Sequence, residues 1–166
     1  MHLEAIAGDI TRQADLDAVV NAANAQLMPG GGVAGAIHRA AGPDLAEACR
    51  PLAPISPGQA VVTAAFGLPN RWVIHCLGPR YGIDEPAAER LAECYRNALR
   101  CAAEYGMASV GFPALSTGAF GYPPDAAAEV AVATVRAAGA ELEMPPERVR
   151  FVLFSEQDLA RYADRL

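Results

Sequence analysis

Short runs of apolar residues alternate along the chain with longer segments in which apolar positions recur every three or four residues. The short runs are typical of buried β-strands, and the longer segments of helices that pack on a sheet. We predict strands at Leu3–Ala7, Asp17–Asn21, Gln59–Ala65, Trp72–Cys76, Ser109–Pro113 and Val149–Phe154. We predict helices at Gly32–Ala41, Asp44–Arg50, Pro86–Gly106, Pro124–Ala138 and Glu156–Leu166. Strands separated by helices indicate an α/β domain with helices on both faces of a largely parallel sheet.

The helix predicted at Pro86–Gly106 has the most clearly marked ends. Asp84 or Glu85 can cap its first turn, and its leading proline suits a position where no N–H is needed. A glycine marks its end, and by the same reasoning Gly139 closes the helix predicted at Pro124–Ala138.

The composition is that of one folded domain spanning residues 1–166. The 52% hydrophobic content and the spread of charge exclude disorder, and the length suits a single core. The formal charge is −6, and all 13 basic residues are Arg, with no Arg stripe. Duplex nucleic acid is therefore excluded as a partner, and a small anionic ligand would have to be held by local backbone dipoles.

Targeting and metal-binding signals are missing from the sequence. No apolar run approaches the ~20 residues of a membrane span, and the N-terminus has no signal-peptide pattern, so we expect a cytoplasmic protein without a membrane partner. Cys49, Cys76, Cys94 and Cys101 form no Cys-x-x-Cys pair, which favours free thiols over a metal site. No cofactor is expected. Because no apolar surface stripe is obvious, we also expect a monomer.

The loops after the strands are where chemistry is expected, because ligands of open α/β sheets bind outside the carboxyl ends of the strands. The first such loop contains Asp9 and Thr11. These side chains can simply cap a turn. Alternatively, the Asp9 carboxylate accepts a hydrogen bond from an exocyclic amine such as that of adenine.

The second loop carries three consecutive glycines, Gly30–Gly32, that lead directly into a predicted helix. Uncovered N–H groups at the positive end of a helix suit a phosphate. The Gly-Lys-Ser/Thr of a P-loop is missing. Asn21 and Asn24 lie just upstream, and their amides can donate to and accept from ribose hydroxyls.

The third loop, Pro113–Pro123, also joins a strand to a helix. Its segment Ser116–Gly121 can form a second anion-binding loop, with Phe120 packed on a sugar face. Two phosphate-sized loops at adjacent strand ends suggest a diphosphate. Phe154 ends the last strand, where it either belongs to the core or stacks on a base.

Five motifs, GDIT, NAAN, GGGVAGAIHRAAG, VIHCLGP and PALSTGAFGYP, occur in this order between about Ala5 and Phe154. Together they resemble a macrodomain, and more specifically its MacroD-type branch. The resemblance implies a three-layer α/β/α fold around a six-stranded mixed, mostly parallel sheet. It also implies a site for ADP-ribose, or for an ADP-ribosylated protein, across the strand ends.

The resemblance assigns roles to individual residues. At the adenine end it implies that Asp9 binds the adenine amine, that Ile10 lies beside Asp9, and that Phe154 packs against the adenine ring. At the distal ribose it implies Asn24 and the backbone amides of Gly31, Gly32 and Val33. The residues that it implies around the diphosphate and distal ribose are Ser116, Thr117, Gly118, Ala119 and Phe120.

One position departs from the pattern of the branch. Where hydrolytic MacroD-type proteins have an Asp thought to position or activate water, this chain has Ala34. A hydrolase of ADP-ribosyl esters would then rely on Asn24 and on the amides around Gly32 to orient water. His38, one helical turn after Ala34, is either a base or a structural residue bonded to backbone. The alternative function is a non-catalytic reader of ADP-ribose.

Overall fold

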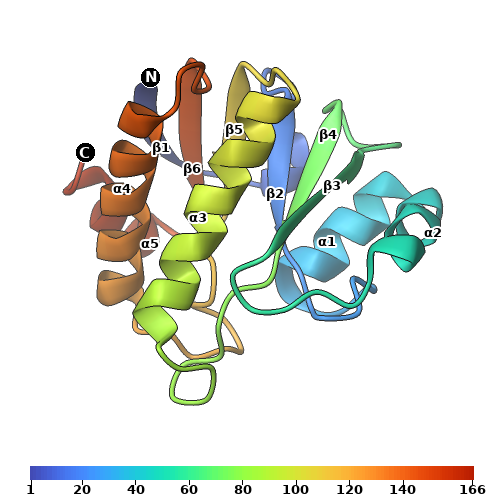
Figure 1. Ribbon diagram of the computed structural model, residues 1–166, viewed down its shortest axis with the longest axis horizontal. Coiled ribbons are helices and arrows are strands. Elements are labelled where there is room, and N and C mark those ends of the chain that lie inside the picture. The colour runs from blue at the N-terminus through green and yellow to red at the C-terminus, as the bar shows by residue number, and fades with distance from the viewer.

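A six-stranded sheet in the order β1-β6-β5-β2-β4-β3 forms the middle layer of the computed structural model, which describes all 166 residues (Figure 1). The strands are β1 (His2–Ala7), β2 (Ala18–Ala22), β3 (Ala60–Ala64), β4 (Trp72–Cys76), β5 (Ser109–Phe112) and β6 (Arg148–Leu153). All neighbours run parallel except β3, which is antiparallel to β4 at one edge of the sheet. The mixed, mostly parallel six-stranded sheet is therefore confirmed.

Helices cover both faces of the sheet (Figure 1). On one face lie α3 (Ala87–Glu104), α4 (Pro124–Glu141) and α5 (Glu156–Ala163), and on the other α1 (Gly32–Ala41) and α2 (Asp44–Cys49). Two short 3₁₀ turns, η1 (Ile10–Arg12) and η2 (Arg50–Leu52), complete the elements. None of the helices combines the length and apolar character needed to cross a lipid bilayer.

Predicted boundaries agree with the structure to within two residues, except at the ends of two helices. Helix α4 continues through Gly139 to Glu141, and this glycine packs against the end of the Met1 side chain. Helix α5 stops at Ala163, and the chain closes with tight turns at its last residues. At the start of α3, Glu85 accepts a hydrogen bond from the Ala87 N–H at 3.2 Å.

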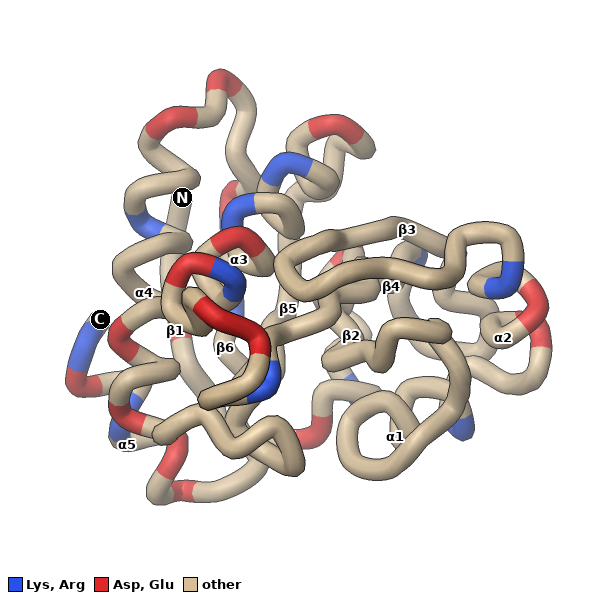
Figure 2. The backbone as a smooth tube through the Cα atoms, turned by 60° about the horizontal axis from the view of Figure 1, so that its bottom comes forward, with Lys and Arg blue, Asp and Glu red and all other residues tan.

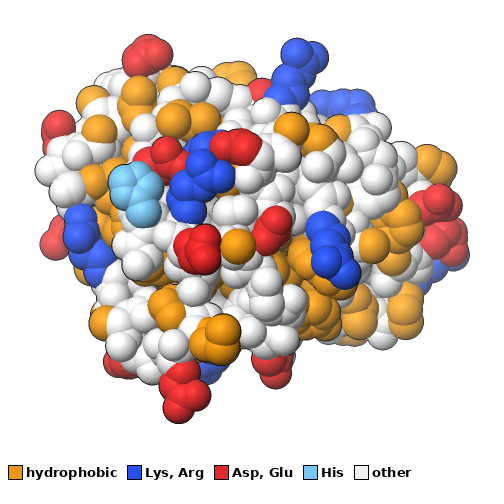
Figure 3. All heavy atoms as spheres, turned by 90° about the horizontal axis from the view of Figure 1, so that it is seen from above, with side chains coloured by type: hydrophobic (Ala, Val, Ile, Leu, Met, Phe, Trp, Pro, Cys, Tyr) orange, Lys and Arg blue, Asp and Glu red, His pale blue; other side chains and the backbone are white.

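Ion pairs hold the amino ends of β1 and β6 together. The Arg150 guanidinium donates to both carboxylate oxygens of Asp15, at 2.7 and 2.8 Å, and to Glu4 at 3.1 Å. The hydrogen bond from Arg150 lowers the pKa of Asp15 to about 2. Figure 3 looks onto this edge and shows positive and negative side chains interspersed rather than gathered by sign.

A buried polar row crosses the sheet beneath α1 and α2. His75 on β4 lies opposite Asn21 on β2, and its Nδ1 is 3.1 Å from the Asn21 Nδ2. Its Nε2 is 2.9 Å from the Thr63 hydroxyl, which itself donates to the Ala64 carbonyl. These partners fix a neutral imidazole that accepts at Nδ1 and donates at Nε2. Burial lowers the pKa of His75 to about 3, and burial also lowers the pKa of His38.

Stability should therefore fall as the pH drops below about 6.5, the pKa of an unfolded histidine. The unfolded chain binds protons at His75 and His38 that the folded chain does not bind. Each histidine therefore lowers the free energy of unfolding by up to about 1.4 kcal/mol per pH unit. Denaturant unfolding between pH 6.5 and 5 measures the slope. His75→Gln should remove the share of the slope that His75 contributes. Equal slopes in wild type and His75→Gln would contradict this account.

Candidate functional site

A cavity of about 390 Å³ opens at the carboxyl ends of β2, β4 and β5. Figure 2 turns this edge of the sheet toward the viewer. Three segments line the cavity: the NAAN turn with the glycine loop, the residue Gly78 after β4, and the loop that begins at Ala114. No lining residue carries a charge. Any anion bound here is therefore held by backbone dipoles.

The glycine loop ends at the N-terminus of α1 without a side-chain cap. Gly31 is the N-cap residue, and the first N–H groups of the helix have no partner within it. The N–H groups of Gly30 and Gly31 also donate to no protein acceptor. The loop lies close against the helix because Gly35 leaves room for the Gly30 carbonyl, with which a Cβ would collide. Five consecutive N–H groups, those of residues 30–34, thus remain free at the positive end of the helix.

The Asn24 side chain braces this loop as well as lining the cavity. Its Nδ2 donates to the Met28 carbonyl at 2.8 Å, and its Oδ1 accepts from the Met28 N–H at 3.0 Å. One amide hydrogen and one oxygen lone pair stay free. Asn24 can therefore bind a ligand in an orientation that the loop itself fixes.

The loop after β5 offers a second set of free donors. Ser116 adopts a left-handed conformation, φ +66°, and its carbonyl accepts from the Tyr122 N–H at 2.9 Å. The Thr117 hydroxyl closes the turn by donating to the Ala114 carbonyl at 3.0 Å. The N–H groups of residues 117–120 donate to no protein acceptor. The two predicted anion-binding loops therefore face one cavity.

Most of the residues predicted for the diphosphate and distal ribose line the cavity. They are Asn24, Gly31, Gly32, Val33, Ser116, Gly118, Ala119 and Phe120, whereas Thr117 is not a lining residue and its hydroxyl closes the turn. Sequence reasoning missed Gly78, where a Cβ would collide with the Ser116 hydroxyl. The glycine-proline pair that follows the strand VIHC was the available signal.

The residues predicted for the adenine end lie outside this cavity, after the neighbouring strands β1 and β6. Phe154 is 97% exposed, so the interpretation as a core residue is wrong. The Asp9 carboxylate accepts from the Thr11 hydroxyl at 2.7 Å and from the Thr11 N–H at 2.9 Å, which lowers the pKa of Asp9. Asp9 caps η1 and remains exposed, whereas Ile10 is buried.

His38 stands apart from the cavity. Its side chain is buried, and neither ring nitrogen has a hydrogen-bond partner, so the interpretation of His38 as bonded to backbone is wrong. Ala34, one turn earlier, does line the cavity and brings only a methyl group. His38 as a base stays a prediction, with a pKa lowered by burial.

The family model of the Macro domain matches residues 20–131, which include the NAAN turn, the glycine loop and the loop after β5. The chain belongs to the macrodomain family. It is 50% identical over 165 residues to a protein of Enterobacter cloacae named O-acetyl-ADP-ribose deacetylase, covering 96% of this chain and 91% of that one.

Solved macrodomains share the fold of this chain. The Oceanobacillus iheyensis macrodomain with ADP superposes with a TM-score of 0.91 at 40% identity, covering 98% of this chain and 88% of that one. The Trypanosoma brucei macrodomain in complex with ADP-ribose gives a TM-score of 0.92 at 35% identity, covering 99% and 68%.

Substituting Gly35→Ala should destabilise this macrodomain. A methyl group in the helix gains up to ~1 kcal/mol of helix propensity, but its clash with the Gly30 carbonyl forces a backbone shift. Overpacking of this kind costs about 1–3 kcal/mol, so we expect a net loss in denaturant unfolding. The matched control is Gly118→Ala, where a Cβ meets nothing and φ is not positive. A Gly35→Ala protein as stable as the control would refute the close-approach argument.

Proposed function

We propose that this macrodomain binds ADP-ribose, with the diphosphate between the glycine loop and the loop after β5. The observation that carries the proposal is that two sets of unpartnered N–H groups face one uncharged cavity. Relatives solved with ADP and with ADP-ribose support the same ligand. Asn24 and the amides of Gly31, Gly32 and Val33 would hold the distal ribose. Asp9 and Phe154 would hold adenine.

The proposed reaction is hydrolysis of O-acetyl-ADP-ribose and of mono-ADP-ribosyl esters on Glu or Asp side chains of proteins. For the acetyl ester, the water oxygen bonds to the acetyl carbon and the ester bond to the ribose oxygen breaks, giving acetate and ADP-ribose. The relative named O-acetyl-ADP-ribose deacetylase supports this choice. The same chemistry would release ADP-ribose from a protein carboxylate.

No side chain in the cavity can accept the proton of the attacking water, because Ala34 and the other lining residues carry no carboxylate or imidazole. We infer that a diphosphate oxygen of the substrate takes this proton and passes it to the ribose oxygen as the ester bond breaks. The protein then contributes orientation, which can supply several kcal/mol of the barrier reduction. Asn24, whose amide is fixed by Met28, would orient the ribose and the water.

A reader of ADP-ribose is the second candidate, favoured by Ala34. A cavity that binds substrate and product equally, without orienting water, gives affinity without turnover. The two functions differ in one measurable quantity, the release of product.

Turnover is measured on O-acetyl-ADP-ribose and on a Glu-linked mono-ADP-ribosylated protein, with products identified by mass spectrometry. Wild type should release ADP-ribose, and Asn24→Ala should lower kcat at least tenfold with a smaller change in Kd for ADP-ribose by calorimetry. Asn24→Ser, which keeps a hydroxyl, separates loss of the loop brace from loss of the amide. Tight binding without release would make the protein a reader, and Ala34→Asp would then be expected to install turnover. A protein that neither binds ADP-ribose nor releases it from these substrates would overturn both proposed functions.

Removing the Phe154 ring should weaken ADP-ribose binding by about fivefold or more, since base–aromatic stacking is worth ~1–3 kcal/mol. Because the ring is 97% exposed, Phe154→Ala should leave the melting temperature unchanged. Calorimetry with ADP-ribose and with ribose 5-phosphate, which has no base, tests the assignment, and only ADP-ribose should lose affinity. Met144→Ala, at another exposed apolar side chain, is the control. An unchanged ADP-ribose affinity in Phe154→Ala would remove Phe154 from the site.

A further inference from the structure

Three residues other than glycine have a left-handed backbone, and two of them belong to the loops of the ligand cavity. The three are Leu27, Phe66 and Ser116. Ser116 lines the cavity, whereas Leu27 lies in the glycine loop between the lining residues Asn24 and Gly30 without lining the cavity itself. A bulky side chain disfavours this conformation, which persists only where the surrounding structure holds it. Any effect of Leu27 on a bound ligand must therefore pass through a neighbouring residue.

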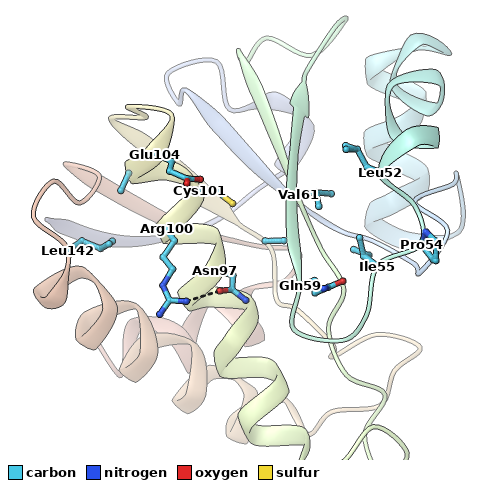
Figure 4. A pocket seen from close by; sticks show the side chains of 12 residues that line it. Leu52, Pro54, Ile55, Gln59, Val61, Asn97, Arg100, Cys101, Glu104 and Leu142 are labelled. Atoms are coloured by element: carbon cyan, nitrogen blue, oxygen red, sulfur yellow. Dashed lines mark hydrogen bonds between the residues drawn. The ribbon is translucent and has the colours of Figure 1, made fainter.

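Burial of its side chain holds Leu27 in place. The side chain is only 1% exposed and belongs to the apolar cluster that includes Ile37 on α1 and Leu45 on α2. A backbone hydrogen bond also fixes the turn that precedes it, because the Ile55 N–H donates to the Ala25 carbonyl at 2.9 Å. Figure 4 shows Ile55 on the segment that leads from α2 to β3. Core packing and this bond together keep Leu27 at φ +57°.

The backbone of Leu27 determines the direction of the peptide that follows it. The Leu27 N–H donates to the Asn24 carbonyl at 3.1 Å and closes a turn. The next N–H, that of Met28, donates to the Asn24 Oδ1 at 3.0 Å, and the Met28 carbonyl accepts from the Asn24 Nδ2 at 2.8 Å. A negative φ at Leu27 would rotate this peptide and release the Asn24 amide. The orientation of Asn24 in the cavity therefore depends on a left-handed Leu27.

We propose that Leu27 is a positioning residue, whose left-handed backbone orients the Asn24 amide toward the ligand. The buried side chain offsets the cost of this conformation. This role rests on the proposed function, in which Asn24 orients the ribose and the water, so Leu27 should affect turnover more than affinity. Leucine suits the position because it branches at Cγ. Isoleucine contains the same atoms but branches at Cβ, and β-branched residues tolerate a positive φ poorly.

Exchange of leucine for its isomer separates backbone conformation from core packing. Leu27→Ile keeps the volume and the apolar character of the side chain but places a branched Cβ at φ +57°. Leu45→Ile makes the same exchange at a buried position in helix α2 and is the matched control. Volume-conserving exchanges of this kind are well tolerated in cores. Leu27→Met, unbranched at Cβ, is the conservative variant and should behave like wild type.

The exchange rate of the Met28 amide, followed by NMR without ligand, measures whether Asn24 is held. Asn24→Ala gives the rate in the absence of its acceptor. Leu27→Ile should raise the rate about tenfold or more, toward that of Asn24→Ala, because the left-handed conformation is then no longer favoured. Leu45→Ile and Leu27→Met should keep the wild-type rate. The amides of β2 report global unfolding and should change less than that of Met28.

The kcat for O-acetyl-ADP-ribose should also fall about tenfold or more in Leu27→Ile, with a smaller change in Kd for ADP-ribose, because misorientation costs rate. Wild-type exchange at Met28 in Leu27→Ile overturns the proposal, as does a wild-type kcat once Met28 exchanges fast. Equal losses in Leu45→Ile also overturn it, because packing alone would explain them. A wild type without turnover contradicts the proposed hydrolysis, and Met28 exchange then decides the role of Leu27 by itself.

Discussion

The site depends on one constraint, that backbone N–H groups without protein acceptors are costly unless they face an open cavity. Parallel strands direct the loops that follow them to the same edge, so the glycine loop and the loop after β5 bring their free donors together. Other hydrogen bonds hold the shape of both loops. They join Asn24 to Met28 in the glycine loop and Ser116 to Tyr122 in the loop after β5. Side chains shape the cavity, and the backbone provides its polarity.

The buried polar row beneath α1 supports the edge of the sheet at which the cavity opens. Asn21 is the first residue of the NAAN segment and lies on β2. Its side-chain amide hydrogen-bonds to His75, and the other ring nitrogen of His75 hydrogen-bonds to the Thr63 hydroxyl. Three strands are thus joined by side-chain hydrogen bonds in a layer that is otherwise apolar. Buried networks of this kind favour one register, although the Asn21 Oδ1 in this row has no hydrogen-bond partner. His38 lies in the same layer without a partner, which makes it the weakest polar member.

The fold was predictable because buried strands and amphipathic helices leave local periodic signals, as in Trp72–Cys76 and α3. What the sequence could not reveal depended on contacts between distant segments. Gly139 looked like a helix stop, yet it makes room for Met1. Gly78 joins the cavity because Ser116 packs on it, 38 positions later. The site loops were found by their glycines, whereas the bonds that brace them could be seen only in the folded chain.

The uncharged lining of the cavity determines how ligand binding responds to pH. None of the lining residues has a side chain that gains or loses a proton at physiological pH. Titration of the lining side chains therefore does not alter ligand affinity near neutral pH, and a diphosphate diester also keeps its two negative charges there. The dipoles that hold an anion here are permanent, so acid acts on the site through the buried histidines that support it.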